Sequence, residues 1–173
     1  MKFLKIVLFE KSINKIKNKS VRNYFLTFFS VKQILVKFLI FLVMSSVLAS
    51  ISFVAREYAL NNWKYELNPG VAFSLGKNLH SNVIITIQAV PIVFSFVAYI
   101  FINNVYLYLP LTFIFIGGSC NLIDRFIPDF GFEGGNPQPS VVDYIYCSTS
   151  IFNFPDIIIV AGCIIFAISC LIY

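Results

Sequence analysis

Charged side chains are scarce in this sequence: Asp, Glu, Lys and Arg together make up 12% of its 173 residues. A soluble globular domain carries about a quarter charged residues, so this deficit argues against one. The hydrophobic share is 58%, and a run of about 20 apolar residues suffices to cross a bilayer. The composition therefore predicts an integral membrane protein with room for four crossings and short connections.

Acidic residues are almost absent from the first third of the chain, where none occurs between Glu10 and Glu57. Residues 1–37 hold nine Lys or Arg side chains against Glu10 alone. A basic block before the first long apolar run is typical of the cytoplasmic side of a membrane. Anionic lipid is its expected partner, and nucleic acid is not, because no aromatic or Gly-rich pattern accompanies the basic residues. We interpret residues 1–33 as a basic cytoplasmic segment and residues 34–173 as the membrane domain.

Residues that commonly bind metals are also few. His80 is the only histidine, and the four cysteines form no CxxC pair. Structural zinc sites need four such ligands at short, regular spacing. We therefore expect no metal site and no cofactor.

Four apolar runs predict four transmembrane helices: Ile34–Ala55, Val83–Ile102, Val105–Ile123 and Ile157–Tyr173. Gly117 and Gly118, near the end of the third run, indicate either close contact between helices or a break before the polar end. The polar intervals between the runs, 56–81 and 124–140, are interpreted as outer loops. The first contains a turn at 68–70, followed by a brief strand or an extended loop. The predicted fold class is an all-α integral membrane protein with a small outer-face strand and loop subdomain.

This topology places every acid except Glu10 on the outer face, including Asp143 and Asp156 at the start of the last crossing. Two carboxyl groups that face one site suggest shared acid and base work on one water. The simpler explanations are a solvated loop acid for Asp143 and a helix cap for Asp156 or Asn153.

Four short motifs lie on that same side, separated by crossings. They are N-P-G-V-A-F at 68–73, N-L-I-D-R at 121–125, V-V-D-Y at 141–144 and F-N-F-P-D at 152–156. In type and order they resemble the signal peptidase II family of bacterial inner-membrane aspartic proteases, whose motifs are N-x-G-x-A-F, N-x-x-D-R, V-V-D-F and F-N-x-A-D. The resemblance extends from about residue 34 to the end of the sequence.

The resemblance implies that Asp143 and Asp156 are the catalytic pair of an intramembrane endopeptidase. The implied substrate is a prolipoprotein that already carries diacylglycerol, and membrane lipid is the other implied partner. We expect a monomer that crosses the bacterial inner membrane several times, with both termini cytoplasmic. The matching motifs imply substrate-binding or supporting roles for Asn68, Gly70, Phe73, Asn121, Asp124, Arg125 and Asn153.

The supporting residues differ in what their side chains can do. We expect Asp124 to hold Arg125 or a backbone group, and Arg125 to hold substrate carbonyls through its forked donors. The three asparagines can donate and accept hydrogen bonds at once, although caps or turns would explain each of them singly as well. Phe73 is most simply an apolar prop, which the family motif places beside the substrate.

The chain also departs from the family pattern. The family's first crossing usually carries D-Q-x-x-K, and this chain has no acid there. Cys120 stands where the family has a Gly, and Pro155 stands where it has an Ala. The interval between residues 124 and 143 is longer than is usual in the family, and the interval between 143 and 156 is shorter. The alternative functions are therefore an inactive family member, or a membrane binding or transport protein that uses the outer acids for a ligand or ion.

Overall fold

The computed structural model describes residues 31–71, 75, 78–127, 139–148 and 150–173. The chain divides into two compact units, residues 1–43 and 44–173, with the boundary inside its first described helix. The candidate site and the packing discussed below belong to the second unit.

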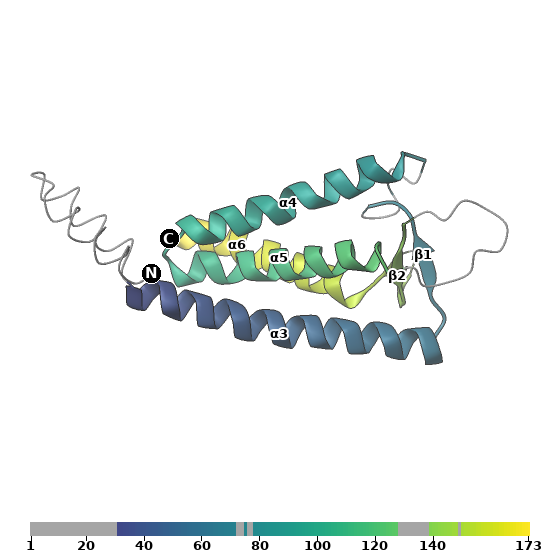
Figure 1. Cartoon of the computed structure of the whole chain (residues 1–173), viewed down its shortest axis with the longest axis horizontal. Coiled ribbons are helices and arrows are strands. Elements are labelled where there is room, and N and C mark those ends of the chain that lie inside the picture. The colour runs from purple at the N-terminus through teal and green to yellow at the C-terminus, as the bar shows by residue number, and fades with distance from the viewer. Residues whose placement is uncertain (1–30, 72–74, 76–77, 128–138, 149) are drawn as a thin grey trace, which may run out of the picture. The chain divides into compact units, whose positions relative to one another are not determined.

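Four helices make up most of the described chain: α3 (Val31–Asn62), α4 (Ser81–Phe101), α5 (Val105–Asp124) and α6 (Phe154–Ile172). Each contains a stretch long and apolar enough to cross a membrane. The predicted fold class is confirmed, because four candidate crossings are combined with small two-stranded sheets. Figure 1 shows α4, α5 and α6 running alongside one another, with β1 and β2 at one end.

Two helix ends differ from those expected from hydrophobicity alone. α3 continues to Asn62, seven residues beyond Ala55, because its last turns pack although they are polar: Ala59 is fully buried against Val142 and Tyr144. α6 begins at Phe154, three residues before Ile157. Its start is set by a capping box, in which Asn153 is the N-cap and Asp156 bonds back to the Asn153 N–H. The expectation that one of these residues caps the helix is confirmed, and both take part.

Glycines set how closely the helices approach. A Cβ added to Gly117 of α5 would lie 2.6 Å from the Pro155 carbonyl oxygen of α6, and one added to Gly118 would lie 2.7 Å from Ile92 of α4. The expectation that these two glycines mark helix contacts is confirmed. Gly117 in particular brings α5 against the first turn of α6, where Asp156 is located.

Two small antiparallel sheets lie outside the helices. β1 (Glu66–Asn68) pairs with β2 (Val141–Asp143), with Glu66 opposite Asp143 and Asn68 opposite Val141. β3 (Ile145–Cys147) pairs with β4 (Ser150–Phe152). The brief strand expected after the turn at 68–70 falls largely on residues 72–74, which lie outside the described residues.

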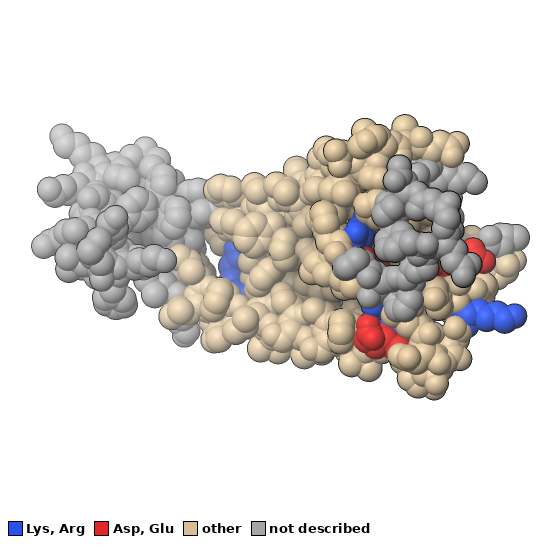
Figure 2. All heavy atoms as spheres, turned by 45° about the vertical axis from the view of Figure 1, so that its right-hand side comes forward, with Lys and Arg blue, Asp and Glu red and all other residues tan. Residues whose placement is uncertain are grey.

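Every Asp and Glu side chain in the described part of the chain belongs to the last turns of α3 or α5, to β1 or β2, or to the first turn of α6. On the face seen in Figure 2, acidic side chains gather at the end of the molecule that carries the strands, and the helical flank shows mostly uncharged residues. The acids are therefore concentrated at one end of the bundle.

We predict that Gly117→Ala destabilises the protein by about 1–3 kcal/mol, because the added methyl group meets a backbone oxygen that cannot rotate away. Thermal unfolding in detergent measures the effect. Ala167→Val, on an exposed face of α6, is the control and leaves the unfolding midpoint nearly unchanged. Equal midpoints for the wild type and Gly117→Ala would contradict the close approach of α5 and α6.

Candidate active site

Asp143, the last residue of β2, has only 4% of its surface exposed. Asn68 Nδ2 donates to Asp143 Oδ2 at 3.0 Å, and Asn153 Nδ2 donates to Asp143 Oδ1 at 2.9 Å. The two donors come from β1 and from the cap of α6. Pairing of β1 with β2 therefore supplies one amide to this carboxyl group, and the start of α6 supplies the other.

Asp156 is in the first turn of α6 and is partly buried. Asn121 Nδ2 of α5 donates to its Oδ1 at 2.7 Å, and the Asn153 backbone N–H donates to its Oδ2 at 3.1 Å. Both carboxylate oxygens thus have a donor, and each donor is fixed by a helix or a helix cap. The role of cap partner does not exclude a chemical role, because the charge of Asp156 also acts on Asp143.

Asn153 connects the two aspartates. Its side chain is almost fully buried, and its Nδ2 donates to both Asp143 Oδ1 and Asn121 Oδ1, the second at 3.0 Å. Its Oδ1 accepts the Asp156 N–H at 3.0 Å. One amide group offers two hydrogens and one acceptor oxygen, so this side chain is fully used. A continuous hydrogen-bonded path therefore runs from Asp143 through Asn153 and Asn121 to Asp156.

The environment of Asp143 changes its acidity. Burial raises the pKa of Asp143 to about 7, and the negative charges of Asp156 and Asp124 add to that rise. The hydrogen bonds from Asn68 and Asn153 oppose it, since they favour the ionised form. A carboxyl group with a pKa near neutrality can both accept and release a proton at physiological pH.

Asp124, at the end of α5, binds both a side chain of α3 and the backbone of β2. It forms an ion pair with Arg56 Nε of α3, and its Oδ2 accepts the Val142 N–H of β2 at 2.7 Å. Of the two partners expected for Asp124, the backbone group is observed. Asp124 also forms an ion pair with Arg56, and its charge acts on Arg125 as well. Asp124 is thus a structural support, next in the chain to Arg125 and bonded to the residue before Asp143.

Arg125 is buried, and its guanidinium group binds the chain itself. Nε donates to Gln88 Oε1 at 2.6 Å, and Nη1 donates to the Pro139 carbonyl at 2.9 Å. The remaining bonds are to carbonyls of the turn at 68–70, including that of Gly70. A buried guanidinium must satisfy its donors, and these carbonyls are its neighbours. The expected hold on substrate carbonyls stays a prediction.

The turn at 68–70 is confirmed in its local geometry, because the Gly70 N–H donates to Asn68 Oδ1 at 3.0 Å. Gly70 is buried, and its carbonyl faces Arg125. Phe73 lies outside the described residues, so its expected place beside a substrate stays a prediction.

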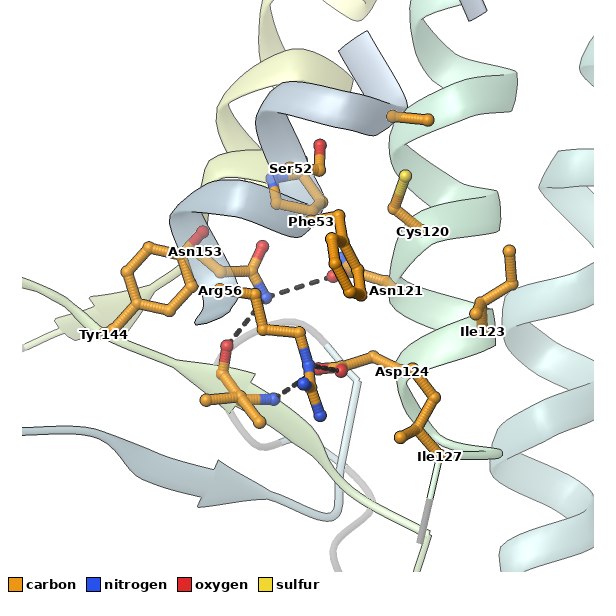
Figure 3. Close-up of a pocket in the computed structure, with 13 residues that line it drawn as sticks. Ser52, Phe53, Arg56, Cys120, Asn121, Ile123, Asp124, Ile127, Tyr144 and Asn153 are labelled. Carbon is orange, nitrogen blue, oxygen red and sulfur yellow. Dashed lines mark hydrogen bonds and ion pairs between the residues drawn. The ribbon is translucent and has the colours of Figure 1, made fainter. Parts of the chain in front are cut away.

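A pocket of about 190 Å³ lies beside this network, between α3 and the facing ends of α5 and α6. Figure 3 shows Asn121 and Asn153 on its wall, joined by a hydrogen bond, with Arg56 and Asp124 paired nearby. Its other lining residues are mainly apolar and include Phe53, Ile123 and Pro155. The two asparagines that bind the aspartates therefore border a mostly apolar space.

Sequence reasoning did not select Arg56 as a site residue. It follows Ser52 by four residues on α3, and both residues line the pocket. The same spacing separates Asp and Lys in the D-Q-x-x-K motif of the family, so S-F-V-A-R at 52–56 was the available signal. In the described residues, no group of three His, Cys, Asp or Glu side chains is placed to hold a metal ion.

Taken together, the fold and site define a multi-pass membrane protein with two carboxyl groups linked through asparagines at one end of its helices. Residues 34–172 match the family described as Signal peptidase (SPase) II. The chain belongs to this family of membrane proteases.

Similar proteins agree with that membership. The "Lipoprotein signal peptidase" of Malacoplasma penetrans is 29% identical over 82% of this chain and 67% of its own length. That of Mycoplasmoides gallisepticum is 32% identical over 89% of this chain, which spans only 55% of that relative. A solved bacterial membrane enzyme, determined by the in meso method, shares the fold with a TM-score of 0.62 and 17% identity, over 76% of this chain and 87% of its own.

We predict that Asn68→Ala raises the pKa of Asp143 above about 7, because the variant loses a hydrogen bond that stabilises the ionised carboxylate. A carbon-13 NMR titration of labelled aspartate in detergent measures it. Asn61→Ala removes an exposed amide that bonds only to its own helix, and serves as the control. A fall in the pKa of Asp143 in Asn68→Ala would show that this amide does not stabilise the ionised form.

Proposed function

We propose that this protein is an aspartic endopeptidase that removes the signal peptide from diacylglyceryl-modified prolipoproteins. Asp143 and Asp156 activate one water in this proposal. The observation that carries it is the hydrogen-bonded path between the two carboxyl groups through Asn153 and Asn121. Membership of a protease family supports the reaction class.

The two aspartates divide the work through one shared proton. Two neighbouring carboxyl groups do not both ionise readily, and the raised pKa of Asp143 favours a state in which one is charged and the other is protonated. The ionised group takes a proton from water as the water oxygen attacks the scissile carbonyl carbon. The protonated group supports the carbonyl oxygen and then delivers a proton to the leaving nitrogen as the C–N bond breaks. The asparagines keep each carboxyl group oriented throughout.

The substrate assignment rests on the relatives, both of which are named lipoprotein signal peptidases. In this proposal the apolar signal peptide lies among the membrane helices, and the diacylglyceryl group stays in the lipid leaflet. The basic residues before α3 favour a cytoplasmic N-terminal side, which places the acids at the outer face of the inner membrane. The four crossings then return the C-terminal end of α6 to the cytoplasm, and the protein acts as a monomer on substrate and lipid without a cofactor.

We predict that Asp143→Asn and Asp156→Asn each lower the rate of signal peptide release by about 10²–10⁴-fold, because an amide cannot exchange the required proton. The variants should still insert and fold, since an Asn side chain has the same shape and its oxygen keeps one of the two hydrogen bonds that each carboxylate accepts. Cleavage of a lipidated precursor by purified protein in detergent or liposomes measures the rate.

Glu66→Gln is the matched control for these variants. Glu66 lies opposite Asp143 in the sheet, but its side chain is exposed, so the variant should cleave at nearly the wild-type rate. Undiminished cleavage by both aspartate variants would refute the proposed pair. Binding or transport of a cation by a wild-type protein that cleaves nothing would favour the membrane binding or transport alternative.

A further inference from the structure

The first crossing contributes a positive charge to the neighbourhood of the site. Arg56 has 7% of its surface exposed and Asp124 has 8%. Removing a charge from water is costly unless a partner compensates it, and the loss of one partner leaves the other uncompensated. The ion pair between Arg56 and Asp124 therefore helps to compensate each of these charges where it is buried.

Asp124 also binds β2, the strand that contains Asp143. β2 pairs with β1 along one edge, and at its other edge the Val142 N–H donates to Asp124 Oδ2. Without that acceptor a backbone donor on a buried strand would be left unpaired. Asp143 follows Val142 directly, so the position of its carboxyl group depends on this anchor.

We propose that Arg56 is a positioning residue for Asp143, acting through Asp124 and the Val142 N–H. This inference rests on the proposed function, since it treats Asp143 as a reacting group. Arg56 fixes the direction of the Asp124 carboxylate, and thereby the edge of β2. It also balances the negative charge that Asp124 adds beside the two aspartates of the site.

The charge balance predicts the direction of each variant's effect. The groups around Asp143 are Glu66 and Asn68 on β1, Asp124 and Arg125 at the end of α5, Tyr144 after β2, Asn153 and Asp156 at the start of α6, and Arg56 on α3 beyond Asp124. The negative charge of Asp124 favours a protonated Asp143. Removing Arg56 exposes Asp143 to more of that charge, whereas removing the charge of Asp124 leaves Arg56 as an added positive neighbour.

The test uses three variants of the full chain: Arg56→Gln, Arg56→Lys and Asp124→Asn. We predict that the pH profile of kcat/KM for a lipidated precursor moves to higher pH in Arg56→Gln and to lower pH in Asp124→Asn, each by about half a pH unit or more. Arg56→Lys keeps the charge and keeps the profile within about 0.2 of a pH unit of the wild type. A purely structural loss would lower activity without moving the two profiles in opposite directions.

Glu57→Gln is the matched control, because Glu57 bonds the same arginine at 2.8 Å through a side chain that is 45% exposed. Solvent screens a charge at such a position, so this variant should keep the wild-type profile. If Arg56→Gln does not fold, Arg56→Lys and Asp124→Asn still carry the test. Profiles that do not move, or that move in the same direction, overturn the inference.

A titration without substrate separates this inference from the proposed function. Carbon-13 NMR of labelled aspartate follows Asp143 directly in the same variants, and the same opposite shifts are expected. Opposite shifts in a protein that does not cleave would support the role of Arg56 and refute the peptidase. Normal cleavage by the wild type with no shift in the variants would refute only the role of Arg56.

Discussion

The buried amide of Asn153 is the interaction on which the arrangement of this protein depends. Its oxygen caps α6, and its nitrogen reaches an aspartate on β2 and an asparagine on α5. A buried amide that loses any of these partners leaves a polar group without compensation. This single side chain consequently links the start of α6, the strand β2 and the end of α5.

Around this amide, the acidic side chains differ in the groups that they bind. Asp124 is paired with an arginine and fixed as a support, whereas Asp143 and Asp156 receive hydrogen bonds from neutral amides. Neutral donors orient a carboxylate without committing it to the ionised form as strongly as a cation would. This difference explains how one small region can contain carboxyl groups suited to structure and others suited to proton transfer.

The four membrane helices and their close contacts could be predicted from the sequence, because long apolar runs indicate the helices and paired glycines indicate where they touch. Local patterns also identified the cap of α6 and the turn at 68–70, in which each polar group bonds a near neighbour. The pairing of β1 with β2 joins residues about 75 apart through three-residue strands, which are too short to show a period.

The place of Arg56 within α3 was not predicted from the sequence. Hydropathy assigns it to a polar loop, and only the packing of Ala59 on Val142 explains why the helix continues through it. The bonds of Arg125 were equally inaccessible, because most of its acceptors are backbone carbonyls, which leave no signature in a sequence.

The length of α3 has a consequence for the depth at which its polar end lies in a membrane. A helix of 32 residues extends about 48 Å, and the hydrocarbon core of a bilayer is about 30 Å thick. The excess is at the polar end, so the turns around Arg56 leave the hydrocarbon or the helix tilts. Which of these occurs depends on the thickness of the surrounding bilayer, so the chain length of the lipids sets how deep the ion pair between Arg56 and Asp124 lies.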